Sequence, residues 1–150
     1  MRPLMLQWWD NLPAMNQPET NRIPLKKFYP GIAWFFLTLI LICIPGYDLP
    51  DVDEWLIEIN FDKLIHVALF GALAFLFMLP VSRSALSKKE KQNWFTRVAL
   101  AVIIWGITTE FIQKFFIPRR SFTLGDWAAD ALGGALALFY FSVRLQKMMK

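Results

Sequence analysis

The chain has 150 residues, of which 56% are hydrophobic and 16% aromatic, and its mean hydropathy is +0.38. A soluble domain of this size is about 45–50% apolar, so the composition indicates one small membrane domain. The formal net charge is +4, but the basic residues lie at the ends of apolar segments, which argues against nucleic acid as a partner.

The lone cysteine, Cys43, lies in an apolar run. It excludes an intramolecular disulfide and a thiolate metal cluster, and we expect no metal and no cofactor.

Residues 1–28 are predicted to form a polar N-terminal tail, because their prolines are spaced too closely for a long helix. The first apolar run follows this tail and begins too late for a typical signal peptide. It is succeeded by Pro45-Gly46-Tyr47 rather than by a small-residue cleavage site. We therefore interpret this run as a retained membrane anchor.

Four apolar segments predict membrane-spanning helices at about 29–44, 64–79, 98–117 and 127–143. Proline at positions 45, 80 and 118 is expected to end the first three. All but the third are shorter than the roughly 20 residues that cross a bilayer, so they must include flanking residues. Almost no polar face is present, which disfavours a soluble bundle. The prediction is an all-α integral membrane bundle of four transmembrane helices within 29–145, followed by a tail at 146–150.

The charges between the segments predict the orientation through the positive-inside rule. The N-terminal tail, the second loop and the C-terminus are basic, whereas the first loop is acidic. Both termini and the second loop are therefore predicted to be cytoplasmic. The third loop is short and predicted to lie outside, yet it contains Lys114, Arg119 and Arg120. Positive charge on the disfavoured side suggests a further role for these residues.

In this orientation, polar residues of three helices are expected to meet near the extracytoplasmic face. Positions three or four apart on a helix share one face, and the polar residues recur at these spacings on each of the three helices. Arginines from the connection between the last two helices lie beside them. The predicted binding set is Asp62, Lys63, His66, Glu110, Gln113, Arg120, Asp126 and Asp130.

Several of these residues also have a structural interpretation. Asp62 and Asp126 suit helix N-termini, and the stretch from Thr123 to Asp126 resembles a capping box with Asp replacing Glu. Lys63 suits a snorkelling side chain, and His66 suits a core histidine with its hydrogen bonds satisfied.

Glu110 is the residue that a structural role explains least well. An ionisable group inside a span costs about 2.5 kcal/mol or more and normally faces a partner or a cavity. Asp130, one turn into the last helix, raises the same question. Arg120 and Lys63 are the expected partners, and a purely structural ion-pair network is the alternative.

Small residues predict how the last helix packs. Ala129, Gly133 and Ala137 recur every four residues and would let another helix approach closely. Gly71 and Gly106 are expected to serve the neighbouring helices in the same way. Such packing would hold Asp126 and Asp130 against the third helix.

Three motifs together resemble the VanZ-like family: DKLIH at 62–66, TEFIQ at 109–113 and RRSFTLGDWAADALGG at 119–134. The family pattern is approximately D-K-x-x-H, then E-x-x-Q, then R-S-x-x-x-x-D-x-x-x-N-x-x-G, and Asp130 stands where the family usually has Asn. The resemblance implies a multi-pass protein of the bacterial inner membrane that acts in the cell envelope. The family association with glycopeptide (teicoplanin) resistance is not carried over as the role of this chain. The resemblance places the family signature on Asp62, Lys63, His66, Glu110, Gln113, Arg120, Asp126, Asp130 and Gly133.

Three functions fit these residues. The favoured one is binding of an anionic lipid or a polyprenyl-phosphate-linked envelope precursor, because arginine binds phosphate through two parallel hydrogen bonds. The second is an enzyme acting on a lipid phosphate, with His66 or Glu110 as general acid or base and with Lys63 and Arg120 stabilising charge. No nucleophile motif supports it directly. The third is a structural set that assembles the bundle or a partner complex.

Overall fold

The computed structural model describes residues 22–45 and 61–147, and helices are the regular secondary structure that these residues form. A short 3-10 helix, η1 (Leu25–Phe28), leads into α2 (Tyr29–Ile42). The remaining helices are α4 (Phe61–Ser82), α5 (Lys88–Phe116) and α6 (Leu124–Lys147). Four helices, with η1 and α2 counted as one, are long and apolar enough to cross a membrane. The predicted all-α bundle of four transmembrane helices is confirmed.

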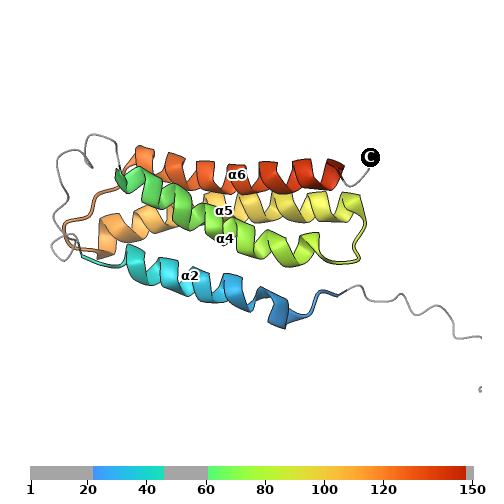
Figure 1. Ribbon diagram of the computed structural model, residues 1–150. Helices are drawn as coiled ribbons and strands as arrows, with labels where there is room; N and C mark the ends of the chain where they lie inside the picture. Colours follow the sequence, from blue (N-terminus) through green and yellow to red (C-terminus); the bar gives the residue numbers. More distant parts are fainter. Residues whose placement is uncertain (1–21, 46–60, 148–150) are drawn as a thin grey trace, which may run out of the picture.

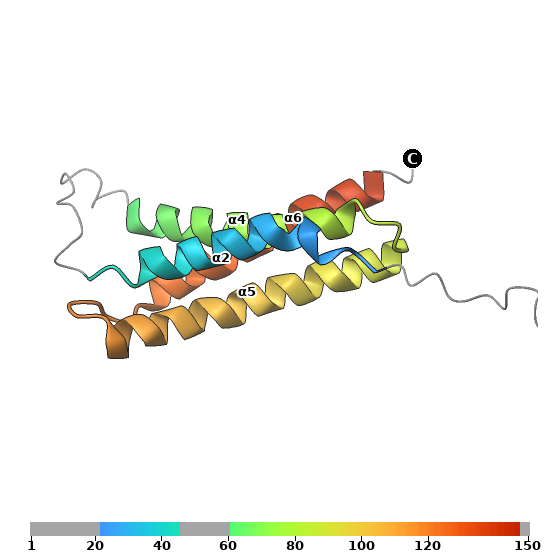
Figure 2. The ribbon, with the colours of Figure 1, turned by 90° about the horizontal axis from the view of Figure 1, so that it is seen from below.

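The helices run side by side and alternate in direction (Figures 1 and 2). The start of α2 and the end of α6 lie at the same end of the bundle as the connection between α4 and α5. At the opposite end, α5 ends while α4 and α6 begin, and we call this the polar end. The most extensive packing is between α4 and α6, with α5 against both, whereas α2 makes few contacts outside α4.

The second helix was predicted to end at Pro80, and this prediction is wrong. Pro80 lies inside α4, which continues to Ser82. Pro80 lacks the N–H that would donate to the Leu76 carbonyl, so α4 loses one backbone hydrogen bond near its end but continues. The chain leaves the helix through side-chain caps, because the hydroxyls of Ser82 and Ser84 each donate to a carbonyl three residues earlier at 2.7 Å.

The third helix begins well before the predicted start near residue 98, so most of the basic stretch assigned to the second loop is helical. Ser87 precedes α5 and forms a capping box with Glu90, in which each side chain accepts from the other residue's backbone N–H. Hydropathy had marked only the apolar part of α5. The charged turns at the ends of α5 and α6 make both helices longer than their apolar segments.

The outer surface of the bundle is apolar. Large side chains such as Phe36, Ile104 and Phe139 are exposed, whereas Glu110 and Asp130 are fully buried. A bundle in water would bury the first group and expose the second, but lipid reverses this preference. The distribution therefore agrees with a multi-pass membrane protein.

Glycines allow α4, α5 and α6 to approach closely, as the small-residue pattern predicted. A Cβ atom on Gly133 of α6 would lie 2.5 Å from the Val67 carbonyl oxygen and 2.6 Å from the Gly71 nitrogen of α4. A Cβ atom on Gly106 of α5 would lie 2.8 Å from Cβ of Asp130. Gly106 thus provides the space in which Asp130 is buried.

Candidate functional site

His66 and Asp130 form a hydrogen-bonded pair at the polar end, between α4 and α6. The distance between Nδ1 of His66 and Oδ1 of Asp130 is 2.8 Å. Asp130 is 0% exposed, and the imidazole of His66 stacks on Phe70 with 6.3 Å between ring centroids. These contacts hold the His66 ring in one orientation.

Glu110, which is 0% exposed, contributes a carboxylate from α5. Its Oε2 atom accepts a hydrogen bond of 2.9 Å from the backbone N–H of Thr123. Its Oε1 atom is buried and has no hydrogen-bond partner among the residues that the structure describes. Arg120 and Lys63 were the partners expected for Glu110 and Asp130. In the described residues a backbone amide and His66 take those positions instead.

Lys63 crosses from α4 to the first turn of α6. Its ammonium nitrogen lies 3.1 Å from Oδ2 of Asp62 and 3.6 Å from Oδ1 of Asp126. Gly125 makes room for this side chain, because a Cβ atom there would lie 2.8 Å from Cε of Lys63. Lys63 therefore joins two helices, in addition to reaching toward the surface.

The start of α6 forms only half of the predicted capping box. The backbone N–H of Asp126 donates to the Thr123 hydroxyl at 3.0 Å. The reciprocal bond, from the Thr123 N–H, goes to Glu110 rather than to Asp126. As a result, the Asp126 carboxylate is not used for capping and is available to the cluster.

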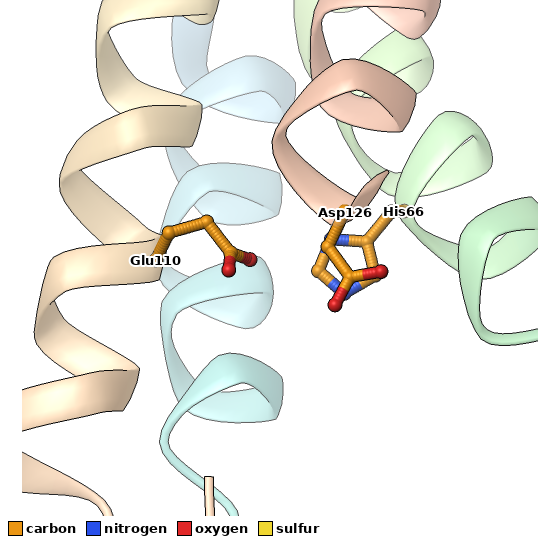
Figure 3. Close-up of side chains that lie close together, drawn as sticks. All are labelled: His66, Glu110 and Asp126. Carbon is orange, nitrogen blue, oxygen red and sulfur yellow. The ribbon is translucent and has the colours of Figure 1, made fainter. Parts of the chain in front are cut away.

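His66, Glu110 and Asp126 come from three different helices and face one another. Each offers a nitrogen or oxygen atom, and these atoms all lie within 4.8 Å of one another. Figure 3 shows Glu110 extending from α5 toward the side chains of Asp126 and His66. We call these three residues the carboxylate–histidine cluster.

The remaining predicted residues lie around this cluster or apart from it. Gln113 is buried and points to α2, where its amide nitrogen donates to the Ile42 carbonyl at 3.4 Å. The Asp62 side chain is mostly exposed. Arg120 is half-buried in the connection between α5 and α6. It forms no salt bridge with another described residue.

Residues without ionisable side chains complete the site, and these residues were not in the predicted binding set. Thr123 fixes Glu110, Gly106 accommodates Asp130, and Gly125 accommodates Lys63. Gly106 had been noted only for helix packing, and Thr123 only as a helix cap. Their contacts across helices carry no signal in the spacing of a single segment.

The fold and the site together define a class: a multi-pass membrane protein with a buried polar cluster at one end of its bundle. Comparison with models of protein families, with characterised proteins and with solved structures finds no match. The resemblance to VanZ-like proteins rests on the three motifs and stays a prediction.

Proposed function

We propose that this membrane protein binds an anionic lipid, or a lipid-linked cell-envelope precursor that carries phosphate, at the polar end. The observation that carries the proposal is the unsatisfied guanidinium group of Arg120. Its Nε atom is buried and lacks a hydrogen-bond partner within residues 22–45 and 61–147. A guanidinium group so placed is suited to phosphate, which it binds through two parallel hydrogen bonds.

The surroundings of Arg120 also suit a lipid. Phe115 and Phe116 at the end of α5 are 67% and 78% exposed, and Leu124 at the start of α6 is 68% exposed. These side chains provide an apolar surface for acyl or polyprenyl chains beside a basic headgroup site. Lys63, which is partly exposed, supplies a second cation at the same end. In this proposal the polar end faces away from the cytoplasm of a bacterial inner membrane.

Native mass spectrometry of the detergent-purified protein tests this proposal, with wild type compared with Arg120→Ala and Arg97→Ala. Arg97 is an exposed arginine near the opposite end of α5 and serves as the matched control. We expect a discrete anionic lipid on wild type and on Arg97→Ala, and its loss from Arg120→Ala. Retention of the same lipid at wild-type occupancy in Arg120→Ala would contradict the proposal. Loss of thermal stability without any bound lipid on wild type would favour the purely structural role.

A second candidate function is catalysis on a lipid phosphate. The observation that favours it is the His66–Asp130 pair, because a carboxylate that orients an imidazole is a common arrangement in general acid–base catalysis. Either His66 or Glu110 would then transfer the proton. A turnover assay on lipid phosphates tests this function. Equal product from wild type and from a Glu110→Gln, His66→Ala double variant would exclude it.

A further inference from the structure

The carboxylate–histidine cluster has the dimensions of a metal site. The candidate ligand atoms of His66, Glu110 and Asp126 lie within 4.8 Å of one another. A tetrahedral ion with bonds of about 2.0–2.2 Å holds its ligands about 3.3–3.6 Å apart. The three side chains would therefore have to close by up to about an ångström to bind one ion, which rotation about their side-chain bonds allows. We propose that these three residues bind one divalent transition-metal ion.

The imidazole of His66 is already arranged as a metal ligand. Its Nδ1 atom is hydrogen-bonded to Asp130 at 2.8 Å, so Nε2 is the ring nitrogen left to coordinate an ion. Histidine ligands in metal sites typically donate their second ring N–H to a carboxylate, which fixes the tautomer and increases the basicity of the ligand. Asp130, which is completely buried, supplies that supporting carboxylate.

The two carboxylates have oxygen atoms available for an ion. Glu110 is anchored through Oε2 by the Thr123 N–H, while its Oε1 is buried and has no hydrogen-bond partner in the described part of the chain. Oδ1 of Asp126 is likewise buried and makes no hydrogen bond there, and its nearest cation is the Lys63 ammonium at 3.6 Å. Buried polar atoms without a hydrogen bond are rare and costly in native proteins. A bound cation would satisfy both oxygens at once.

The local charge also favours a cation. Glu110, Asp126 and Asp130 place three carboxyl groups around one histidine. Among the described lysines and arginines, Lys63 alone lies within 4 Å of any of these groups, and it reaches only Asp126. A divalent ion would offset the remaining negative charge in a part of the protein where water is scarce.

The ligand set indicates the class of metal. One imidazole nitrogen with two carboxylate oxygens suits Zn²⁺ or Mn²⁺, whereas Mg²⁺ and Ca²⁺ prefer oxygen ligands alone. The lone cysteine argued only against a thiolate cluster, and the proposed mixed nitrogen and oxygen site departs from the expectation that the chain binds no metal. This inference does not depend on lipid binding, because the test uses the metal alone.

The test measures Zn²⁺ binding to the full chain, purified in detergent with a tag that contains no histidine and stripped with a chelator. Stoichiometry is measured by elemental analysis after gel filtration, and affinity by competition with a chromophoric chelator. The variants are Glu110→Gln, Asp126→Asn and the supporting-residue variant Asp130→Asn. Glu90→Gln is the matched control, since it removes one carboxylate from the opposite end of α5 and glutamine also serves in a capping box. Circular dichroism and elution volume establish that each variant is folded.

We expect one equivalent of Zn²⁺ on wild type and on Glu90→Gln. Glu110→Gln and Asp126→Asn should weaken binding at least about tenfold, and Asp130→Asn by about 10- to 100-fold through His66. Wild type that retains no Zn²⁺ would overturn the proposal. Folded Glu110→Gln and Asp126→Asn proteins with the affinity of Glu90→Gln would also overturn it.

Discussion

At the scale of single residues, Glu110 links the end of α5 to the start of α6. In an ordinary capping box, the acid three residues into a helix accepts from the N–H of the residue that precedes the helix. Here the corresponding N–H, that of Thr123 before α6, donates to Glu110, which belongs to a different helix, α5. The same side chain therefore caps α6 and contributes to the carboxylate–histidine cluster. Its two oxygens divide these tasks.

This division predicts different effects for two substitutions of Glu110. Glu110→Ala leaves the Thr123 N–H without its acceptor and should lower the free energy of unfolding by about 1–3 kcal/mol. Glu110→Gln keeps an oxygen acceptor of similar reach and should lose clearly less. Unfolding of the detergent-solubilised variants, followed by circular dichroism, measures both. Equal losses for Ala and Gln would show that the hydrogen bond to Thr123 is not what Glu110 contributes to stability.

The sequence predicted which residues meet at the candidate site, but not which of them interact with each other. The spacing of His66, Glu110, Asp126 and Asp130 along their helices placed them at one end, where the structure brings them together. Spacing within a helix does not report how neighbouring helices are rotated, and so the wrong partners were assigned. Gln113 illustrates the limit: three residues from Glu110, it is turned by about 60° around the helix. That rotation is enough to direct it to α2.

At the scale of elements, the contact between α4 and α6 is asymmetric although glycines form both sides of it. A Cβ atom on Gly133 would clash with backbone atoms of α4 at 2.5 and 2.6 Å. A Cβ atom on Gly71 would lie 3.4 Å from the nearest atom of α6, which is an acceptable distance. Backbone atoms cannot move aside as the end of a flexible side chain can.

The asymmetry predicts that Gly133→Ala and Gly71→Ala differ in stability. Gly133→Ala should lower the free energy of unfolding by about 1–3 kcal/mol, because α4 and α6 must separate to fit the methyl group. Gly71→Ala should be nearly neutral, since the gain in helix propensity, up to about 1 kcal/mol, offsets a tight contact. Thermal unfolding of the two variants side by side makes the comparison. A Gly71→Ala protein that is the less stable of the two would contradict this account of the interface.

The existence and number of the helices followed from hydropathy, but their ends did not. Hydropathy responds to the part of a helix that lies in lipid. The charged first turns of α5 are helical because Ser87 and Glu90 cap them, which an apolar window cannot detect. Pro80 was given too much weight as a helix stop, because it removes one backbone hydrogen bond, to the Leu76 carbonyl, and α4 continues to Ser82.

At the scale of the whole molecule, four alternating spans place the two described ends of the chain at one end of the bundle (Figures 1 and 2). The connection between α4 and α5 lies at that end, and the polar end is opposite. The positive-inside rule predicts that the first of these ends is cytoplasmic.

Two exposed positions allow this orientation to be measured, with Cys43→Ser as the background. Ala85→Cys lies between α4 and α5, and Ser121→Cys lies between α5 and α6. A membrane-impermeant maleimide should label Ser121→Cys in right-side-out vesicles and Ala85→Cys only in inside-out vesicles. The reverse pattern would contradict the positive-inside prediction but would still agree with the alternating arrangement of the spans. Labelling of both positions from one side would contradict the arrangement of spans itself.

The buried polar face of α6 has a consequence for biosynthesis. Of the four spans, α6 has the lowest mean hydropathy, and its first turns contain Asp126 and Asp130. A chain is made from its N-terminus, so α4 and α5 are synthesised before α6. His66 and the space beside Gly106 are then present when Asp130 arrives. Membrane insertion of the last span is thus coupled to docking on the earlier ones. A chain whose synthesis ended before α6 would leave that docking surface exposed to lipid.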